Sequence, residues 1–182
     1  MNVEKGCLES CFDCSFKDNT SSFSGAAVSI AEKSFLTCRG YGFEANSSNF
    51  HGGAVSNDEG SMNFESCIFK NNDSGNDTPE DIEKLKKSNF GKDKVFRSSY
   101  SGEGGAVYNS NGPAVFTDCV FEGNVAGCGG AISHYRDELV IKNGTFKSNN
   151  ANRTDGGVFF NLGKLKVEGS VFERNVAEYH GG

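Results

Sequence analysis

Four residues with chemically useful side chains stand at one recurring position of the chain, each directly before a pair of glycines. They are Glu103, Cys128, Asp155 and His180. Thiols, imidazoles and carboxylates are the ligands of zinc sites and the partners of nucleophile–base pairs. Such chemistry requires the four positions to stack about 5 Å apart in the fold. The alternative is a set of exposed turn residues, which the unequal turn lengths favour, so the sequence assigns no catalytic residue, metal or cofactor.

The glycine pairs themselves could be taken for phosphate-binding loops. A phosphate loop needs a Lys-Ser/Thr pair and the start of a helix after the glycines, and neither follows here. Instead the motif recurs along the chain, as GAAV at 25–28, GGAV at 52–55 and 104–107, GGAI at 129–132, GGVF at 156–159 and Gly181-Gly182. We therefore interpret each pair as a tight bend with positive φ in a repeated structural unit.

A phenylalanine returns about every 26 residues, in phase with the glycine motif. The set is Phe16, Phe43, Phe69, Phe96, Phe121, Phe146 and Phe172. Three residues after six of them stand Asn19, Asn46, Asn72, Asn124, Asn149 and Asn175, while Ser99 takes this place after Phe96. A fixed period that is kept along the whole chain predicts a repeat architecture.

Apolar residues precede each Phe at fixed distances. Seven residues before it stand Leu36, Met62, Ala114, Leu139 and Leu165, and five before it stand Cys11, Cys38, Phe64, Phe116, Ile141 and Val167. Alternate apolar residues are typical of a strand with one buried face. The next buried position lies two before the Phe, at Cys14, Cys67 and Cys119, and this break in the alternation predicts a bend. Each unit is expected to hold three short strands and three bends.

These patterns predict an all-β fold, a right-handed single-stranded parallel β-helix of about six to seven coils. One coil cannot bury its apolar face alone, so neighbouring coils must cover one another. The seven Phe are expected to form an internal stack, and the six Asn a ladder of side-chain hydrogen bonds. We expect residues 1–182 to form a single β-helix domain that is a fragment of a longer repeat protein, because neither end carries a recognisable cap.

The repeat is interrupted once, over residues 73–94. Within this segment Thr78-Pro79-Glu80-Asp81 has the residues of a helix start, namely a hydroxyl N-cap, a proline and two acids. We expect a helical excursion from one coil, after which the repeat resumes with Phe96. A surface excursion without function is the simpler interpretation, and a partner-binding element is the alternative.

The seven cysteines are an odd number, which leaves at least one without a partner in the chain. Cys11 and Cys38 are expected on adjacent coils, where a disulfide is geometrically feasible. Cys67 and Cys119 are expected about two coils apart, which is too far for a disulfide. The favoured interpretation is that these thiols are buried and act as small hydrophobic side chains.

Charge and hydropathy limit the classes of function. A net charge of −6 without a Lys/Arg cluster argues against nucleic-acid binding. No segment has the length and apolarity of a signal peptide or a membrane span, so the chain either stays inside the cell or belongs to a longer secreted protein. We favour the second. In a eukaryotic secretory pathway Asn76 would be the most accessible glycosylation site.

The tetrads FKDN, FEAN, FKNN, FEGN, FKSN and FERN, in phase with GGAV and GGAI, resemble the chlamydial polymorphic membrane protein repeat. The resemblance covers almost the whole chain. It implies a right-handed β-helix of the passenger-domain type, exposed at the cell surface and used in adhesion, and it ties adhesion to the FxxN and GGA(I/L/V) tetrads. The expected partner is a host-cell or matrix protein or a glycan.

We therefore expect a surface-exposed, non-catalytic adhesive or structural module at an extracellular location, associated with the outer membrane if the source is bacterial. One alternative is a carbohydrate-active, pectin lyase-like β-helix enzyme, which requires convergent acids on one wall. Another is a shaft or filament segment that associates end to end or continues into further repeats.

Overall fold

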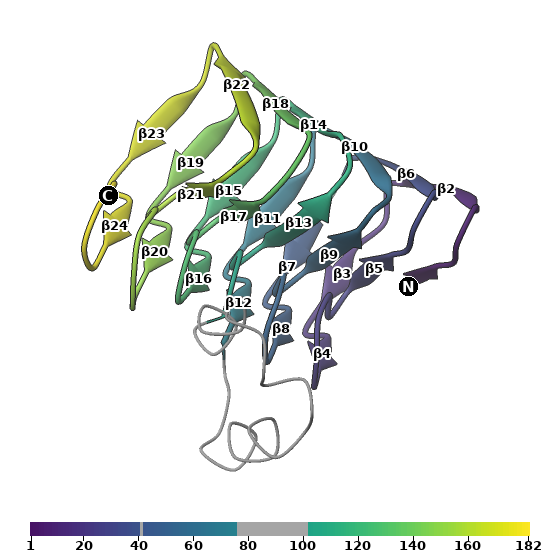
Figure 1. Ribbon diagram of the computed structural model, residues 1–182, viewed down its shortest axis with the longest axis horizontal. Helices are drawn as coiled ribbons and strands as arrows, with labels where there is room; N and C mark the ends of the chain where they lie inside the picture. Colours follow the sequence, from purple (N-terminus) through teal and green to yellow (C-terminus); the bar gives the residue numbers. More distant parts are fainter. Residues whose placement is uncertain (41, 76–101) are drawn as a thin grey trace.

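In the computed structural model the chain winds into a solenoid, whose coils follow one another from the N-terminal to the C-terminal end (Figure 1). The structure describes residues 1–40, 42–75 and 102–182. All regular elements in these ranges are β-strands, and they form four parallel sheets of six strands each. Each sheet takes one strand from every coil, which confirms the predicted all-β parallel β-helix.

We name the sheets A to D in the order in which each coil passes through them. Sheet A contains Asn2–Val3 (β1), Val28–Ile30 (β5), Val55–Asp58 (β9), Val107–Asn111 (β13), Ile132–His134 (β17) and Phe159–Asn161 (β21). Sheet B contains Leu8–Phe12 (β2), Phe35–Arg39 (β6), Ser61–Glu65 (β10), Ala114–Thr117 (β14), Glu138–Lys142 (β18) and Lys164–Glu168 (β22). Sheet A follows the glycine pairs, and sheet B carries the alternating apolar residues.

The other two sheets lie on either side of the ladder asparagines. Sheet C contains Phe16–Lys17 (β3), Gly42–Glu44 (β7), Ile68–Lys70 (β11), Val120–Glu122 (β15), Thr145–Lys147 (β19) and Val171–Glu173 (β23). Sheet D contains Thr20–Ser21 (β4), Ser47–Ser48 (β8), Asp73–Ser74 (β12), Val125–Ala126 (β16), Asn150–Ala151 (β20) and Val176–Ala177 (β24). Sheet C carries the Phe of each tetrad.

The prediction of three strands per coil is therefore wrong, because each coil has a fourth strand in sheet D. Its strands are two residues long and follow the ladder Asn directly, as Val125–Ala126 follows Asn124. A two-residue strand cannot display the alternation of apolar and polar residues by which a strand is found in a sequence.

The bends are formed by residues with left-handed backbone conformation at fixed positions. Asp118, before sheet C, has a φ of 53°, and Gly123, after it, has a φ of 65°. The two glycines of a pair serve different purposes. Gly129 has a φ of 61°, which favours glycine, whereas a Cβ added at Gly130 would lie 2.4 Å from the Gly157 carbonyl oxygen of the next coil. The pair therefore allows both the bend and the close approach of coils.

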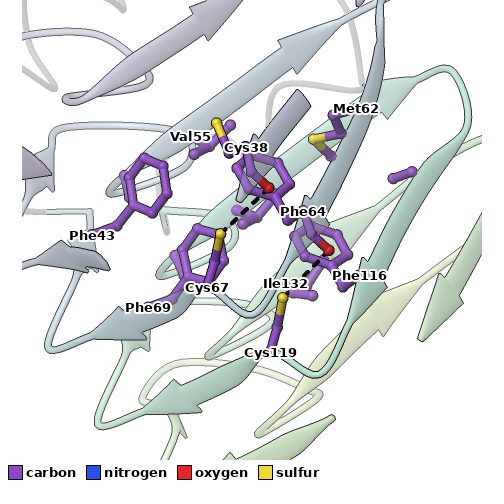
Figure 2. Close-up of a cluster of buried hydrophobic side chains, with 14 of the residues drawn as sticks. Cys38, Phe43, Val55, Met62, Phe64, Cys67, Phe69, Phe116, Cys119 and Ile132 are labelled. Carbon is purple, nitrogen blue, oxygen red and sulfur yellow. Dashed lines mark hydrogen bonds between the residues drawn. The ribbon is translucent and has the colours of Figure 1, made fainter. Parts of the chain in front are cut away.

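The core is a stack of phenylalanine rings along the solenoid axis. Ring centroids are 4.8 Å apart for Phe43 and Phe69 and 4.9 Å apart for Phe121 and Phe146, with nearly parallel planes. These separations match the spacing of adjacent strands. A second pair from sheet B, Phe64 and Phe116, packs edge-on against the first stack (Figure 2). The predicted stack is confirmed for Phe16, Phe43, Phe69, Phe121, Phe146 and Phe172.

The position predicted for Phe96 requires a correction. Phe69 pairs directly with Phe121 in the parallel register of β11 and β15, and their ring centroids are 4.7 Å apart. No rung lies between them, so the stack has six described rungs instead of seven. Phe96 itself lies outside the described residues. Cys67 and Cys119 consequently belong to adjacent coils, and the expected separation of two coils is wrong.

The described residues on the two sides of the interruption belong to one coil. Asp73 and Ser74, which the sequence assigned to the excursion, pair in register with Ser47 and Ser48 of β8. At the return, the Glu103 backbone N–H donates to the Phe50 carbonyl oxygen at 2.8 Å. The remainder of the predicted helical excursion, with its helix start and with Asn76, lies outside the described residues.

The outer face of sheet C carries a row of alternating charge. Its members, in register from coil to coil, are Lys17, Glu44, Lys70, Glu122, Lys147 and Glu173. The Nζ–Oε2 distance is 3.3 Å for Lys17 and Glu44 and 3.8 Å for Lys70 and Glu122. Opposite charges on adjacent strands favour this register, because a slipped register would separate the paired charges. No helix in the described ranges is long and apolar enough to cross a membrane.

Candidate functional site

The asparagines of the FxxN tetrads form a continuous ladder inside the solenoid. The Asn72 Nδ2 donates to Asn124 Oδ1 at 3.0 Å, and the Asn124 Nδ2 donates to Asn149 Oδ1 at 2.9 Å. From Asn46 onward each Nδ2 also donates to the carbonyl oxygen of a Phe in the preceding coil, as Asn124 does to Phe69 at 2.9 Å. The ladder includes all six predicted members, Asn19, Asn46, Asn72, Asn124, Asn149 and Asn175.

The tetrad side chains are therefore used inside the fold. Phe69, Phe121, Asn72 and Asn124 have no exposed surface. Buried amides satisfied on both sides stabilise the stacking of coils, and a ligand cannot reach them. Recognition of a partner must fall to side chains on the outside of the coils.

A second polar ladder, which the sequence analysis did not identify, runs along sheet A. The Asn57 Nδ2 donates to Asn109 Oδ1 at 2.7 Å, and the Asn109 Nδ2 lies 2.9 Å from His134 Nδ1. His134 is fully buried, and burial lowers its pKa. Because Asn109 is the donor, Nδ1 accepts and the imidazole is neutral, with its proton on Nε2 facing the Asp137 carbonyl oxygen at 3.4 Å. The sequence marks this second ladder by a polar residue two positions after each GGAV or GGAI.

The column before the glycine pairs is aligned by the backbone as the sequence required. His51 forms an isolated parallel β-bridge with Glu103, and Glu103 forms one with Cys128. The Gly129 N–H donates to the Asp155 carbonyl oxygen, and the Gly156 N–H donates to that of His180. The column thus contains the four predicted residues and, in addition, Ser24 and His51.

Glu103 is the buried acid of this column, with a side chain that is 2% exposed. The Tyr135 hydroxyl donates to its Oε1 at 2.7 Å, and His51 Nδ1 lies 3.8 Å from its Oε2. Burial lowers the pKa of His51 despite the neighbouring carboxylate. The imidazole is therefore neutral near pH 7, and its contact with Glu103 is not an ion pair there.

Cys128 pairs with Glu103 through the backbone, but Asp155 and His180 contact each other instead of Glu103. The Asp155 Oδ1 and His180 Nδ1 lie 2.7 Å apart on the exposed part of the column. Burial raises the pKa of the Cys128 thiol to about 11, so the thiol is protonated and is a poor nucleophile. Among the residues that the structure describes, no three His, Cys, Asp or Glu side chains are grouped so that they could hold a metal ion.

Next to Glu103, aromatic rings follow one another along the outside of sheet A. We call His51, Tyr108, Tyr135 and Phe160 the aromatic row. Ring centroids are 4.4 Å apart for His51 and Tyr108, 5.7 Å for Tyr108 and Tyr135, and 5.8 Å for Tyr135 and Phe160. Burial raises the pKa of Tyr108 to about 12, so the phenol stays neutral. Flat, partly exposed rings in sequence form a surface on which sugars or apolar side chains can pack.

The aromatic row adjoins a shallow depression of about 660 Å³ at the corner between sheets A and B. Its wall combines Tyr135 with charged residues of both signs, namely Arg136, Asp137, Glu138 and Lys164. The Asp137 carboxylate accepts a hydrogen bond from the Gly112 N–H at 2.8 Å, which ties it to the neighbouring coil. A ligand on the aromatic row could therefore make both apolar and charged contacts in the depression.

Comparison with known proteins gives one match. Residues 118–135, which include β15, β16 and β17, match the model of the Chlamydia polymorphic membrane protein repeat. Neither the curated proteins nor the solved structures contain a significant match. The matched segment includes Phe121 and Asn124 together with Gly129 and Gly130, which are the residues that build the stack, the ladder and the bend. The chain is therefore a β-solenoid in which residues 118–135 are similar to the Chlamydia polymorphic membrane protein repeat.

Proposed function

We propose that this chain is a surface-exposed, non-catalytic adhesion module that presents the aromatic row on a rigid solenoid. The observation that carries the proposal is that the repeat residues lie inside the solenoid, whereas the aromatic row lies on its outside. Phe121 and Asn124 of the matched repeat are fully buried, whereas Tyr108 and Phe160 lie at positions that point outward from sheet A. The repeat family supports a location at the cell surface, associated with the outer membrane in a bacterium.

The partner that fits this surface is a host-cell or matrix protein or a glycan. Aromatic rings supply large, rigid contact areas at low entropic cost, and they dominate the energy of many interfaces. Arg136 and Lys164 in the adjoining depression add positive charges that suit sulfated or carboxylated groups. The neutral Tyr108 phenol adds a hydrogen-bond donor for a polar ligand.

The test is an adhesion assay with a variant that the fold already tolerates. Tyr108 is in register with Ser56 and Ser133, and Phe160 is in register with Ser133. The double variant Tyr108→Ser, Phe160→Ser therefore places at both positions a residue that neighbouring coils carry. Beads coated with either protein are applied to cultured cells, to fibronectin and laminin, and to a glycan array.

The proposal predicts that wild-type beads adhere and that the double variant loses adhesion by about tenfold or more, as expected for hot-spot aromatics. The matched control is Val140→Thr, on the outer face of sheet B, which should adhere like the wild type. Equal adhesion by the double variant and the control, at equal thermal stability, would exclude the aromatic row as the adhesive surface.

The depression is also the place to test the enzyme alternative, because it brings Asp137 and Glu138 together. The bond from Gly112 N–H gives Asp137 a role in the turn, which favours the non-catalytic proposal. A panel of polysaccharides is incubated with the wild type and with Glu138→Gln. We expect no change in polysaccharide chain length with either protein, and cleavage that disappears in Glu138→Gln would establish the enzyme instead.

A shaft segment that associates end to end is the second candidate, because the two polar rows have a direction. Each ladder Asn donates to the Oδ1 of the next, so Asn19 offers an acceptor at one end and Asn175 a donor at the other. The charge row likewise begins with Lys17 and finishes with Glu173. Head-to-tail contacts of this kind do not close and produce filaments. Sedimentation velocity should then show species that grow with concentration and that Lys17→Glu suppresses, whereas a monomer at all concentrations would exclude this candidate.

A further inference from the structure

Two cysteines that lie far apart in the sequence meet at one corner of the core. Cys67 and Cys119 directly precede β11 and β15, which pair in parallel with Phe69 opposite Phe121. The Val120 N–H donates to the Cys67 carbonyl oxygen at 2.9 Å, which joins the two residues through the backbone ladder. Figure 2 shows the two side chains on neighbouring coils, and both are 1% exposed.

The spacing suits a covalent link between them. Equivalent residues on adjacent parallel strands have Cα atoms about 4.8 Å apart, which lies within the range of about 4.4–6.8 Å seen in disulfides. The thiols also interact with each other. A hydrogen bond between Cys119 and Cys67, together with burial, raises the pKa of Cys119, and the same bond lowers that of Cys67. One sulfur is thus biased toward the thiolate and has the other sulfur within reach.

In the structure both residues are free thiols, and each sulfur also lies near a carbonyl oxygen of sheet B. The Cys67 Sγ lies 3.6 Å from the Cys38 carbonyl oxygen, and the Cys119 Sγ lies 3.5 Å from that of Phe64. Such S–H···O contacts are weak, so losing them costs little. In the sequence the two cysteines enclose the insertion between β12 and Glu103.

We infer that Cys67 and Cys119 form a disulfide under oxidising conditions, which fixes the coils on either side of the inserted segment. The oxidant is a small-molecule or protein disulfide. The Cys67 thiolate attacks one of its sulfur atoms and releases one thiol, and the Cys119 thiolate then attacks the mixed disulfide at Cys67 and releases the second. Two thiols of the chain are oxidised and one external disulfide is reduced.

A link between these residues constrains a long loop of the unfolded chain, and longer loops give larger stabilisation. For a loop of this length the oxidised form should melt about 5–15 °C above the reduced form. The disulfide would therefore stabilise the two coils between which the repeat is interrupted.

The test uses the whole chain, refolded from denaturant in a buffer of oxidised and reduced glutathione. After blocking of free thiols, trypsin should release the peptide 40–70 linked to the peptide 98–136. Fragmentation must place the bond at Cys119, because Cys128 lies in the same peptide. The Cys67→Ser, Cys119→Ser variant should lack the linked peptide and the thermal shift, whereas Cys11→Ser, Cys38→Ser should keep both.

Three outcomes would overturn the inference. They are free thiols at Cys67 and Cys119 after refolding, glutathione attached to either residue without a cross-link, and a bond from Cys67 to Cys38 instead. The linked peptide is sought in the wild-type protein, so the result stands even where a variant fails to fold.

Discussion

Phe69 lies face to face with Phe121, with ring centroids 4.7 Å apart and planes inclined by 4°. The same coils are joined one step further along, where Asn72 and Asn124, 52 positions apart, share a hydrogen bond of 3.0 Å. The coils that contain these residues are therefore direct neighbours in the solenoid, although the insertion separates them in the sequence. The ring stack and the Asn ladder pass directly from one of these coils to the next. Substitutions in either should therefore change the free energy of unfolding according to their position in the stack or ladder.

The ring stack predicts that a central rung contributes more to stability than a terminal one. Phe121 is fully buried between Phe69 and Phe146, whereas Phe172 is 48% exposed at the last coil. Phe121→Ala should lower the free energy of unfolding by about 3–5 kcal/mol, the range for buried Phe. Phe172→Ala should cost less than half as much. Urea denaturation followed by circular dichroism gives both values, and equal losses would contradict the stacked core.

The asparagine ladder predicts a large effect from a small change. Asn124→Ala removes the donor to Asn149 and to the Phe69 carbonyl oxygen, and it removes the acceptor for Asn72. Buried partners left without a hydrogen bond cost about 1–3 kcal/mol each, so we expect a loss of at least about 3 kcal/mol. Asn152→Ala, at an exposed position, is the matched control and should lie within about 0.5 kcal/mol of the wild type. Similar melting temperatures for the two variants would argue against the ladder.

The buried His134 predicts a loss of stability in mild acid. Its pKa is lowered in the fold, so the unfolded chain binds the proton first, at a pKa of about 6.5. Stability is then fully present above about pH 6.5. It falls as the pH drops below that value, by up to about 1.4 kcal/mol per pH unit, until the pH reaches the folded pKa. Protonation would also place a hydrogen on Nδ1 against the donor Nδ2 of Asn109. The groups facing the imidazole are the carbonyl oxygen and carboxylate of Asp137 and the backbone of Lys164.

The variant His134→Asn isolates this contribution, because Asn occupies the equivalent position in β9 and β13. The difference in unfolding free energy between wild type and variant is measured from pH 8 to pH 5. We expect the difference to shift in favour of the variant as the pH falls. A pH-independent difference would show that the imidazole does not titrate between the two states.

The charge row predicts a modest and salt-dependent effect. Lys70→Glu places a carboxylate between Glu44 and Glu122, on the exposed face of sheet C. Exposed pairs contribute up to about 1 kcal/mol, and like charges opposite one another destabilise by similar amounts. The variant should therefore lose about 1–2 kcal/mol at low salt and recover part of it at 1 M salt. Lys70→Gln, which removes the ion pair with Glu122 but adds no like charge, is the control and should lose less. A loss in Lys70→Glu that does not depend on salt would argue against an electrostatic origin.

Much of the fold could be predicted because the sequence of one coil recurs several times. The Phe, the Asn and the glycine pair each mark a fixed position, and a pattern that is ambiguous in one coil becomes clear when it recurs at the same position in others. Sheet D could not be found in this way, since Val125–Ala126 is too short to show alternation. The false rung at Phe96 arose because its sequence context imitates a repeat, whereas only the pairing of β11 with β15 shows which coils are adjacent.

The candidate site was predictable only in part, for a different reason. The column of Glu103, Cys128, Asp155 and His180 is aligned as the glycine motif required. His51, one partner of Glu103, shares its column, but the hydrogen-bond donor Tyr135 comes from another position of the repeat, beyond the end of β17. A period fixes which residues share a column, but the contacts between columns depend on how the coil bends. The aromatic row could not be predicted from the sequence for the same reason.

We propose that the tetrads build the scaffold and that the aromatic row makes the adhesive contact. The most direct test compares adhesion of two folded variants under identical conditions. Phe121→Leu alters a buried tetrad residue, and the double variant Tyr108→Ser, Phe160→Ser alters only the outer row. At a temperature where circular dichroism shows both folded, we predict that beads coated with Phe121→Leu adhere like wild type and that the double variant adheres about tenfold less. Loss of adhesion in Phe121→Leu, with full adhesion in the double variant, would show instead that the tetrads make the adhesive contact.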